Sequence, residues 1–303
     1  MKAWVLHGIG DLRFEDVPVP EPQDDEVIVK VKAAGICSSD IARVYSSGAY
    51  HYPIILGHEF SGIAPDGTRV GVFPLLPCHI CGSCMARQYE TCSSYGYLGS
   101  RQDGAFAEYV AVKKWNLVAL PDEMTFEQAA LLEPAAVALH AVKRAGLGGV
   151  TSAGVIGDGV IGRLIAKWLS ILCDADVSVL GRGSVTPNEK CDVCFEAAGS
   201  ADALRRCIEL AKPNGQVVLV GNPGVDFVID QMLHWQILRK QLSVTGSWNS
   251  SYPEDWNETL NNAGALRLEG FIGVRYKLDE LGGAFENVRG KGKGRGKAVV
   301  VFD

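Results

Sequence analysis

The chain has 303 residues, enough for a complete hydrophobic core and for two domains. Its hydrophobic content of 47% and charged content of 21% are those of an ordinary globular protein. A net charge of -6 gives no electrostatic reason to bind nucleic acid or an acidic membrane. The first apolar run is too short for a signal peptide, and no later run reaches membrane-spanning length. Nine cysteines then indicate thiols and metal ligands in a reducing compartment, so the cytoplasm is the expected location.

Short β-strands separated by Gly, Pro and Asp are predicted for the first part of the chain, to about Asp122. Valines at positions 27, 29 and 31 alternate with other residues, as in a strand with one face inward. The Pro-Asp-Gly sequence at residues 65–67 is a turn signal before a further strand. The predicted strands are residues 3–6, 13–19, 27–34, 68–74, 104–112 and 115–120.

The segment 35–62 contains the candidate catalytic residues. Cys37, His58 and Glu59 offer a thiolate, an imidazole and a carboxylate, a ligand set that suits zinc. Three protein ligands without an obvious fourth are typical of a catalytic zinc, which keeps one position open for water or substrate. Taken alone, the three residues would be better explained as a buried free cysteine and an unrelated histidine. The rest of the chain favours the metal site.

Four cysteines follow at a spacing that is specific for metal binding. Cys78, Cys81, Cys84 and Cys92 give the pattern C-x2-C-x2-C-x7-C, which predicts a closed structural zinc site. An iron–sulfur cluster also uses four cysteines, and we rank it well behind zinc. Disulfides are the weakest option in a reducing compartment, and the acidic chain argues against a zinc ribbon for nucleic acid. His79 is expected to be a surface residue.

A helical region is predicted at residues 125–146. Thr125 is a suitable N-cap, and Pro134 should break or restart the helix. Glu133 lies in an apolar run of Ala, Leu and Pro, where a carboxylate needs a partner, and a metal is a good one. The alternative is a Glu133 side chain that reaches solvent from the helix surface.

From about residue 154, strands and helices alternate, which is the mark of a parallel doubly wound sheet. The connection at residues 181–190 is short for this fold, and the junction at 62–65 is similarly compressed. Either the domain is reduced or residues are missing from the sequence. We favour the second, since a missing strand would leave a long unpaired edge. We predict strands at 153–157, 176–180, 191–196, 216–221 and 242–247, helices at 160–172 and 201–212, and a closing C-terminal strand.

A glycine-rich turn connects the first predicted strand and helix of that sheet. The pattern G-x-G-x-x-G places Gly157 for a tight turn, Gly159 for close approach of a pyrophosphate and Gly162 for helix packing. Val160 and Ile161 complete this dinucleotide-binding turn. No carboxylate ends the next strand, where Gly181 and Arg182 stand instead. Because Arg182 could meet a 2′-phosphate, the sequence favours NADP over NAD, unless Arg182 is an ordinary solvated turn residue.

Together these motifs resemble the zinc-dependent medium-chain dehydrogenase/reductase family, in its polyol dehydrogenase branch. The resemblance covers essentially the whole chain, including residues 35–40, 57–59, 103–109, 133–134 and 157–162 and the four-cysteine segment. Residues 52–62, 74–78, 237–240 and 246–248 are similar to those of dehydrogenases of galactitol 1-phosphate. The resemblance implies an α/β protein. A GroES-like β-rich catalytic domain would comprise residues 1–134 and 265–303, with the zinc lobe at 78–92, and a Rossmann domain would comprise residues 135–264.

The same resemblance implies a zinc-dependent oxidoreductase that moves a hydride between a secondary alcohol, in a polyol or polyol phosphate, and NADP or NAD. Cys37 and His58 would bind the catalytic zinc in the cleft between the domains, with Glu59, Glu133 or both in alternation as third ligand. Zinc would act as a Lewis acid, and Ser39 would pass on the released proton. Asp40 would accept a hydrogen bond from the second nitrogen of His58. A homodimer or homotetramer with a small-molecule substrate, and without nucleic-acid or membrane partners, is expected.

Several basic residues are weaker candidates. Arg43, Arg239 and Lys240 could hold a substrate phosphate or the cofactor, although surface cations are usually only solvated. Lys291, Lys293, Arg295 and Lys297 alternate with glycine or follow it and are predicted to form a flexible, exposed loop. Two other functions stay open: a threonine or simple alcohol dehydrogenase of the same fold, and a non-catalytic zinc-stabilised redox sensor that binds a dinucleotide.

Overall fold

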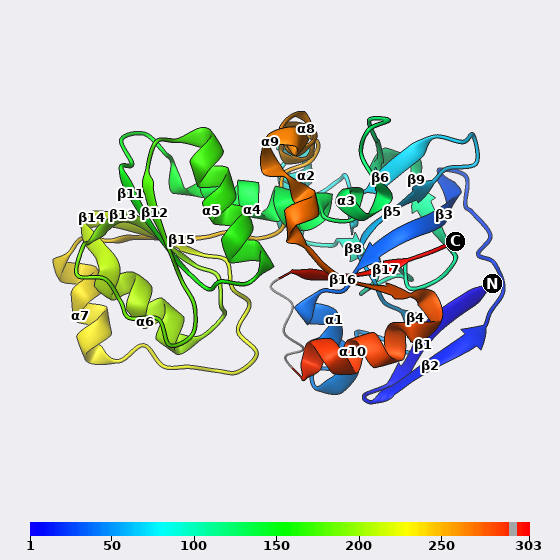
Figure 1. Cartoon of the computed structure of the whole chain (residues 1–303), viewed down its shortest axis with the longest axis horizontal. Helices are drawn as coiled ribbons and strands as arrows, with labels where there is room; N and C mark the ends of the chain where they lie inside the picture. Colours follow the sequence, from blue (N-terminus) through cyan, green and yellow to red (C-terminus); the bar gives the residue numbers. More distant parts are fainter. Residues whose placement is uncertain (291–295) are drawn as a thin grey trace. The chain divides into compact units, whose positions relative to one another are not determined.

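The structure is a computed structural model that describes residues 1–290 and 296–303. It contains two compact units (Figure 1). Unit 1 comprises Met1–Glu133 and Arg267–Asp303, and unit 2 comprises Pro134–Leu266. These boundaries lie within two residues of the predicted ones. Both chain ends therefore belong to unit 1.

Unit 1 is built mainly of antiparallel strands. Its largest sheet has seven strands in the order β10-β6-β5-β3-β17-β16, with β9 also paired to β3. These are Leu117–Ala119, Arg69–Val72, Glu59–Ile63, Glu26–Gly35, Lys297–Val301, Ile272–Lys277 and Tyr109–Lys113. A second sheet contains β2 (Asp11–Asp16), β1 (Lys2–Gly8) and β4 (Ile54–Ile55), and a third contains β7 (Leu75–Leu76) and β8 (Gly96–Tyr97).

The pairing of β3 determines where the candidate catalytic residues lie. On one side β5 runs antiparallel to it, with Glu59 opposite Gly35. On the other side β17, from the C-terminal end of the chain, places Val299 opposite Gly35. Because β3 ends at Gly35, its last residue has the start of β5 on one side and β17 on the other. Residues 37, 59 and 297 are thereby brought together.

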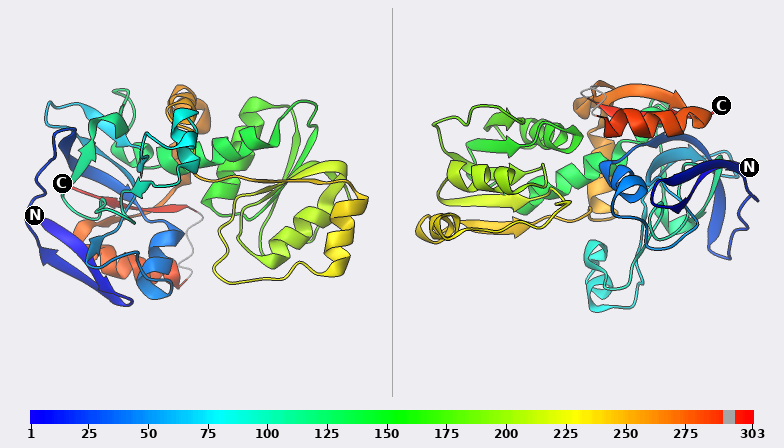
Figure 2. Two further views of the ribbon diagram at one scale, coloured as in Figure 1. Left: turned by 180° about the vertical axis from the view of Figure 1, so that it is seen from behind. Right: turned by 90° about the horizontal axis from the view of Figure 1, so that it is seen from below.

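The helices of unit 1 are short. They are α1 (Ser38–Tyr45), α2 (Gly82–Met85), α3 (Phe126–Ala129) and α10 (Leu281–Arg289), with 3-10 turns at Tyr89–Thr91, Lys114–Asn116, Leu268–Phe271 and Leu278–Glu280. The core of unit 1 includes Phe60, Phe106 and Phe285, and the last two rings meet edge to face at 5.6 Å. The segment around α2 projects away from these sheets (Figure 2).

Unit 2 is organised around a parallel sheet of five strands in the order β12-β11-β13-β14-β15. The strands are Asp176–Leu180, Ser152–Ile156, Cys191–Glu196, Ala211–Leu219 and Ser243–Gly246. The chain moves outward from β11 to β12 through α5 (Val160–Leu172) and in the other direction from β13 to β14 through α6 (Ala201–Leu210). Right-handed crossovers in opposite directions place α5 and α6 on opposite faces, as in Figure 1. The predicted doubly wound sheet is confirmed.

Residues 181–190 contain no helix or strand, so β12 is an edge strand of the sheet as the chain stands. The remaining helices of unit 2 are α7 (Gln231–Arg239), α8 (Glu254–Asn261) and α9 (Ala263–Leu266). Helix α4 (Leu132–Ala145) begins at the unit boundary. It starts before Pro134, because proline is tolerated in the first turn of a helix. No helix in the described part of the chain is long and apolar enough to cross a membrane.

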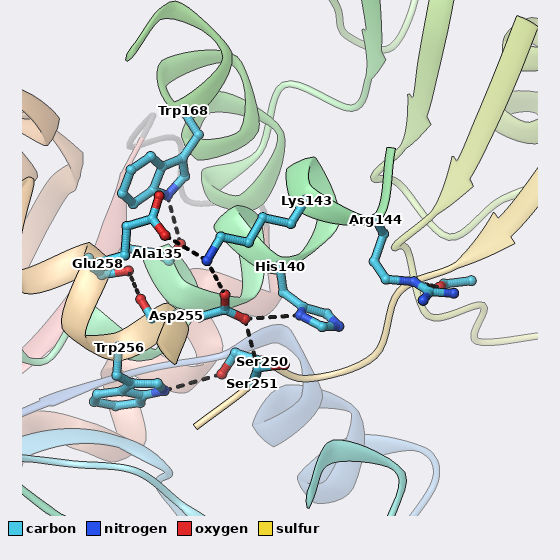
Figure 3. A network of polar contacts seen from close by, with 12 residues as sticks. Ala135, His140, Lys143, Arg144, Trp168, Ser250, Ser251, Asp255, Trp256 and Glu258 are labelled. Atoms are coloured by element: carbon cyan, nitrogen blue, oxygen red, sulfur yellow. Dashed lines mark hydrogen bonds and ion pairs between the residues drawn. The ribbon is translucent and has the colours of Figure 1, made fainter. Parts of the chain in front are cut away.

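A buried polar network joins α4 to α8 (Figure 3). The carboxylate of Asp255 accepts hydrogen bonds from His140 Nδ1 at 2.9 Å, Lys143 Nζ at 2.9 Å and the Ser251 amide at 2.7 Å. Lys143 also pairs with Glu258 at 2.6 Å. Burial alone would raise the pKa of Asp255, but the hydrogen bonds from His140 and Lys143 outweigh it and hold that pKa below its usual value.

Candidate functional site

Three candidate metal ligands lie together where β3 ends and β5 begins. Ligand atoms of Cys37, His58 and Glu59 are all within 4.8 Å of one another. His58 and Glu59 are buried, and a carboxylate oxygen of Glu59, Oε2, has no hydrogen-bond partner. A Cβ atom at Gly35 would lie 2.3 Å from this oxygen, so the glycine leaves the space that the carboxylate fills. A sulfur, a nitrogen and an unpaired buried oxygen at this separation fit a zinc ion.

The second carboxylate, Glu133, lies beside this cluster but is not part of it. Tyr97 donates a hydrogen bond of 3.0 Å to Glu133 Oε1, and the Tyr97 ring meets that of His58 edge to face at 5.7 Å. Burial, with the charge of Glu59 next in size, raises the pKa of Glu133 to about 7. Two buried carboxylates and a thiol at one place therefore call for compensating positive charge.

Lys297 supplies one such positive charge. From the sequence, Lys297 was predicted to lie in a flexible, exposed loop. That prediction is wrong. Lys297 opens β17, is buried, and its Nζ atom lies 2.6 Å from Glu59 Oε1. A lysine that begins an apolar strand inside a sheet must find a counter-charge, and the register of β17 beside β3 supplies it. Lys291, Lys293 and Arg295 lie outside the described residues.

Asp40 and Ser39 lie in the first turn of α1, directly after Cys37. Asp40 is fully buried; one of its oxygens accepts a hydrogen bond of 3.0 Å from the Cys37 amide. Its other oxygen lies 3.3 Å from His58 Nδ1, close but not in hydrogen-bond alignment. Burial acts to lower the pKa of His58, but the charges of Asp40 and Cys37 outweigh it and raise that pKa well above its usual value. The half-buried Ser39 has its backbone carbonyl bound by Arg43 at 3.2 Å.

The four cysteines of the lobe form a second cluster, again with ligand atoms within 4.8 Å of one another. The Sγ atoms of Cys78 and Cys84 are 3.9 Å apart, as are those of Cys81 and Cys92. A tetrahedron with zinc–sulfur bonds of about 2.3 Å has edges of about 3.8 Å, so this cluster fits a zinc ion. Backbone amides of Cys84 and Ser93 lower the pKa of the Cys81 thiol, which favours the thiolate that a metal needs. His79 lies outside the cluster, with its ring against Trp115.

The glycine turn has the space that a dinucleotide requires. Gly157 has φ +126°, and a Cβ atom at Gly162 would lie 1.8 Å from the Gly157 carbonyl oxygen. A Cβ atom at Gly159, the N-cap of α5, would meet no protein atom within 4 Å. Two glycines are thus needed by the backbone, and the third leaves open space at a helix N-terminus, where a pyrophosphate binds well. Val160 and Ile161 begin α5, and Gly181 and Arg182 directly follow β12.

Sequence reasoning missed Arg101, which lies with Arg43 at an exposed tyrosine. The guanidinium carbon of Arg101 is 4.1 Å from the centre of the Tyr50 ring, and that of Arg43 is 5.7 Å from it. Lys240, by contrast, is not available for a ligand. Its Nζ donates to the carbonyls of Ile208, Glu209 and Ala211 at the end of α6. Arg239 stacks on Trp235, its neighbour on α7.

Comparisons with known proteins identify the family. Family models for the alcohol dehydrogenase GroES-like domain and for zinc-binding dehydrogenase match residues 23–122 and 183–264. Galactitol 1-phosphate 5-dehydrogenase of Escherichia coli K12 is 32% identical over 333 aligned positions, which cover 95% of this chain and 96% of that protein. The chain belongs to the zinc-dependent medium-chain dehydrogenase/reductase family. Sorbitol dehydrogenase of Bombyx mori is 30% identical and covers 92% of each chain.

Solved structures agree. The crystal structure of galactitol-1-phosphate dehydrogenase from E. coli matches with a TM-score of 0.91 at 31% identity and covers 100% of both chains. A zinc-binding dehydrogenase from Sinorhizobium meliloti bound to NADP (TM-score 0.89, 26% identity, 99% of both chains) is also similar. So is a dehydrogenase from E. coli CFT073 in complex with NADH (TM-score 0.89, 25% identity, 100% of this chain and 99% of that chain).

The protein is therefore a zinc- and NAD(P)-dependent dehydrogenase of alcohols or polyols, and the predicted pairing of GroES-like and Rossmann folds is confirmed. The alignment with the E. coli enzyme spans 333 positions, more than the 303 residues of this chain. The relative therefore has residues for which this chain has no counterpart, as the compressed junctions suggest.

Proposed function

We propose that the protein oxidises a secondary alcohol of a phosphorylated polyol, of the galactitol 1-phosphate type, with reduction of a nicotinamide cofactor. The relative at 32% identity carries a name of this class, which supports the proposal. The observation that carries it is a pair of arginines at the Tyr50 ring: Arg43, on the helix that Cys37 caps, and Arg101, on the loop after β8.

The catalytic metal ligands in this proposal are Cys37, His58 and Glu59, and Glu133 is held nearby by Tyr97. Bound zinc supplies a Lewis acid toward the substrate hydroxyl, and the nicotinamide supplies the hydride acceptor. The charges of Cys37 and Glu59 would balance a divalent ion, Lys297 forms an ion pair with Glu59, and Tyr97 donates a hydrogen bond to Glu133. This pairing makes a buried site of several charges acceptable.

Two residues of α1 are proposed to act around this centre. Asp40 accepts a hydrogen bond from the backbone amide of Cys37, and its other oxygen lies 3.3 Å from His58 Nδ1. It can therefore orient both proposed ligands. Ser39, half-buried on the same turn, offers a hydroxyl that can receive the proton of the substrate alcohol and pass it to solvent. The four cysteines hold the structural zinc, and residues 157–162 hold the cofactor pyrophosphate.

The arginine pair is connected to the catalytic cluster by a row of aromatic rings. From His58 the contacts run to Tyr97 at 5.7 Å and from Tyr97 to Tyr95 at 6.4 Å. Arg101 lies 4.7 Å from the Tyr95 ring and 4.1 Å from the Tyr50 ring, which Arg43 also approaches. Arg43 follows Cys37 by six residues, about 9 Å along a helix, which is comparable with the length of a hexitol phosphate.

Neither guanidinium forms an ion pair within the described residues, and Arg43 Nε is buried without a hydrogen-bond partner. By contrast Arg289, which also stacks on a tyrosine, lies 3.8 Å from the carboxylate of Glu286. Two guanidinium groups without a carboxylate, held by stacking, are suited to a phosphate.

The test compares kcat/KM for galactitol 1-phosphate and for galactitol. We expect a preference of about 100-fold or more for the phosphate, and a loss of about 10- to 100-fold in Arg43→Ala or Arg101→Ala with the phosphate only. Arg289→Ala is the matched control and should change neither value. Equal turnover of the free polyol, or equal losses on both substrates, would contradict the proposal.

A threonine or simple alcohol dehydrogenase remains the alternative substrate class, and the same assay with threonine and 2-butanol would detect it. A homodimer or homotetramer in the cytoplasm also remains a prediction. Size-exclusion chromatography with light scattering measures the oligomeric state. The redox-sensor alternative is not supported, because the relatives are dehydrogenases.

A further inference from the structure

No acidic residue ends β12, but the carboxylate of Asp158, from the glycine turn after β11, lies at this strand end. Gly181 stands about twenty residues after the glycine turn, where dinucleotide-binding folds carry the acid that binds the adenosine ribose. In the structure, a Cβ atom at Gly181 would lie 2.5 Å from Asp158 Oδ2 and 3.0 Å from Asp158 Oδ1. The Asp158 carboxylate therefore fills the space in which a side chain of residue 181 would begin.

The backbone holds these two residues together. The Gly157 amide donates a hydrogen bond of 2.9 Å to the carbonyl of Leu180, the last residue of β12. This bond fixes the glycine turn against the end of β12. Asp158 directly follows the donor residue Gly157, and Gly181 directly follows the acceptor residue Leu180. Asp158 is exposed, so its oxygens are accessible to a ligand at the carboxyl end of the sheet.

Two arginines near Gly181 differ in their contacts. Arg206 donates to the carbonyls of Gly181 and Ser184 and to the Thr186 hydroxyl, at 3.1 to 3.2 Å. The Arg206 guanidinium thus stabilises the loop after β12 through these hydrogen bonds. Arg182 is exposed and directly follows Gly181, so it is a candidate to meet a phosphate.

We infer that Asp158 is the residue that selects the cofactor, by accepting hydrogen bonds from the ribose hydroxyls of NAD and repelling the 2′-phosphate of NADP. The acid comes from the middle of the G-x-G-x-x-G turn, and Gly181 is the position that makes room for it. A carboxylate against a phosphate at hydrogen-bond distance brings two like charges together, whereas the ribose 2′-hydroxyl gives a charged hydrogen bond. The protein should therefore prefer NAD, which reverses the preference that Arg182 suggested.

The test measures binding without turnover. The zinc-loaded protein is titrated calorimetrically with 5′-AMP and with 2′,5′-ADP, which differ only in the 2′-phosphate. We expect the wild-type protein to bind 5′-AMP more tightly by about 100-fold, and Asp158→Asn to reduce this ratio by about 10- to 100-fold. Asp176→Asn, which removes an exposed carboxylate at the opposite end of β12, is the matched control and should leave the wild-type preference for 5′-AMP in place.

A relocation variant tests the position of the charge. Asp158→Gly combined with Gly181→Asp moves the carboxylate from the turn to the strand end and should restore the preference for 5′-AMP that Asp158→Gly alone removes. Tighter binding of 2′,5′-ADP by the wild type, or an unchanged ratio in Asp158→Asn, would overturn the inference. So would a relocation variant that folds, by circular dichroism, but still fails to discriminate.

Discussion

At the scale of single residues, the buried ion pair of Lys297 and Glu59 is what connects the far end of the chain to the catalytic cluster. The two residues are 238 positions apart in sequence, and both are buried. One oxygen of Glu59 is taken by Lys297, and the other is left for a metal ion. The lysine would thus orient the proposed ligand Glu59 as well as balance its charge.

Replacement of Lys297 by methionine removes this counter-charge but keeps most of the side-chain volume. We expect a loss of about 3 kcal/mol in the free energy of unfolding, because one buried charge of a pair is left alone. Urea unfolding of the zinc-loaded protein measures it. Lys297→Arg keeps the charge and should lose less than about 1 kcal/mol. A Lys297→Met variant as stable as Lys297→Arg would show that the pair does not stabilise the fold.

Gly35→Ala tests whether Glu59 is the third ligand. The new Cβ atom would meet Glu59 Oε2 at 2.3 Å and must displace the carboxylate from the cluster. We expect the catalytic zinc to be lost and the structural zinc to be kept, as measured by metal analysis after dialysis. Gly8→Ala, in a strand with nothing within 4 Å of the new atom, is the control. Full zinc content in Gly35→Ala would point to Glu133 as the ligand.

Sequence reasoning could propose Cys37, His58 and Glu59 because ligand chemistry is visible in residue types. It could not find Lys297, because the contact depends on the register of β17 beside β3. The available signal was a lysine opening the apolar run of 298–301. Asp158 was missed for a related reason. We looked in the sequence for an acidic residue at the end of β12 itself, whereas Asp158 belongs to the glycine turn after β11, which is hydrogen-bonded to that strand end.

At the scale of elements, the Asp255 network shows how α4 is fixed within unit 2. Asp255, on α8, is 1% exposed and binds both His140 and Lys143, one turn apart on α4 (Figure 3). Nearby, Trp168 of α5 donates a hydrogen bond of 2.8 Å to the carbonyl of Ala135. Helix α4 is therefore anchored at both its first and its later turns.

Asp255→Asn should lower the free energy of unfolding by about 2 to 3 kcal/mol at pH 7. Because the folded protein holds the pKa of Asp255 below its usual value, protons bind more readily to the unfolded chain. The stabilisation is therefore complete above about pH 5 and decreases as the pH falls from about 4 towards the lower pKa of Asp255 in the folded protein.

Urea unfolding measures the free energy of unfolding of wild type and Asp255→Asn between pH 7 and pH 3. The difference between the two proteins should be constant from pH 7 to about pH 5 and should decrease below about pH 4. Glu258→Gln, which removes the half-exposed partner of Lys143, is the control and should cost less than about 1 kcal/mol. A difference between wild type and Asp255→Asn that is as large at pH 3 as at pH 7 would mean that the charge of Asp255 is not its source.

The elements themselves were mostly predictable, because hydrophobic periodicity is local. Helix α5 and strands β12 and β13 have the predicted bounds. The predicted strand 104–112 is shorter, since β9 begins only at Tyr109. Residues 104–106 instead donate backbone hydrogen bonds to the carbonyls of residues 55–57. Such pairing with a distant loop leaves no periodic signal in the sequence.

At the scale of the whole molecule, the two candidate zinc sites and the glycine turn are divided between the units. Both metal clusters lie in unit 1, and the whole glycine turn with Asp158 and Gly181 lies in unit 2. Each unit has its own buried core. The proposed metal sites and the proposed site for the adenosine end of the cofactor thus belong to different parts of the chain.

Cys84→Ser tests this division. Loss of one thiolate from a closed four-sulfur site should release the structural zinc and unfold the lobe, because zinc binding and local folding are one process. We expect zinc content to fall by one ion and thermal unfolding to begin at lower temperature, while the affinity for 5′-AMP stays within about twofold of wild type. Cys173→Ser, a free thiol of unit 2 outside any cluster, should change neither. A loss of 5′-AMP affinity in step with the zinc would mean that the units do not act independently.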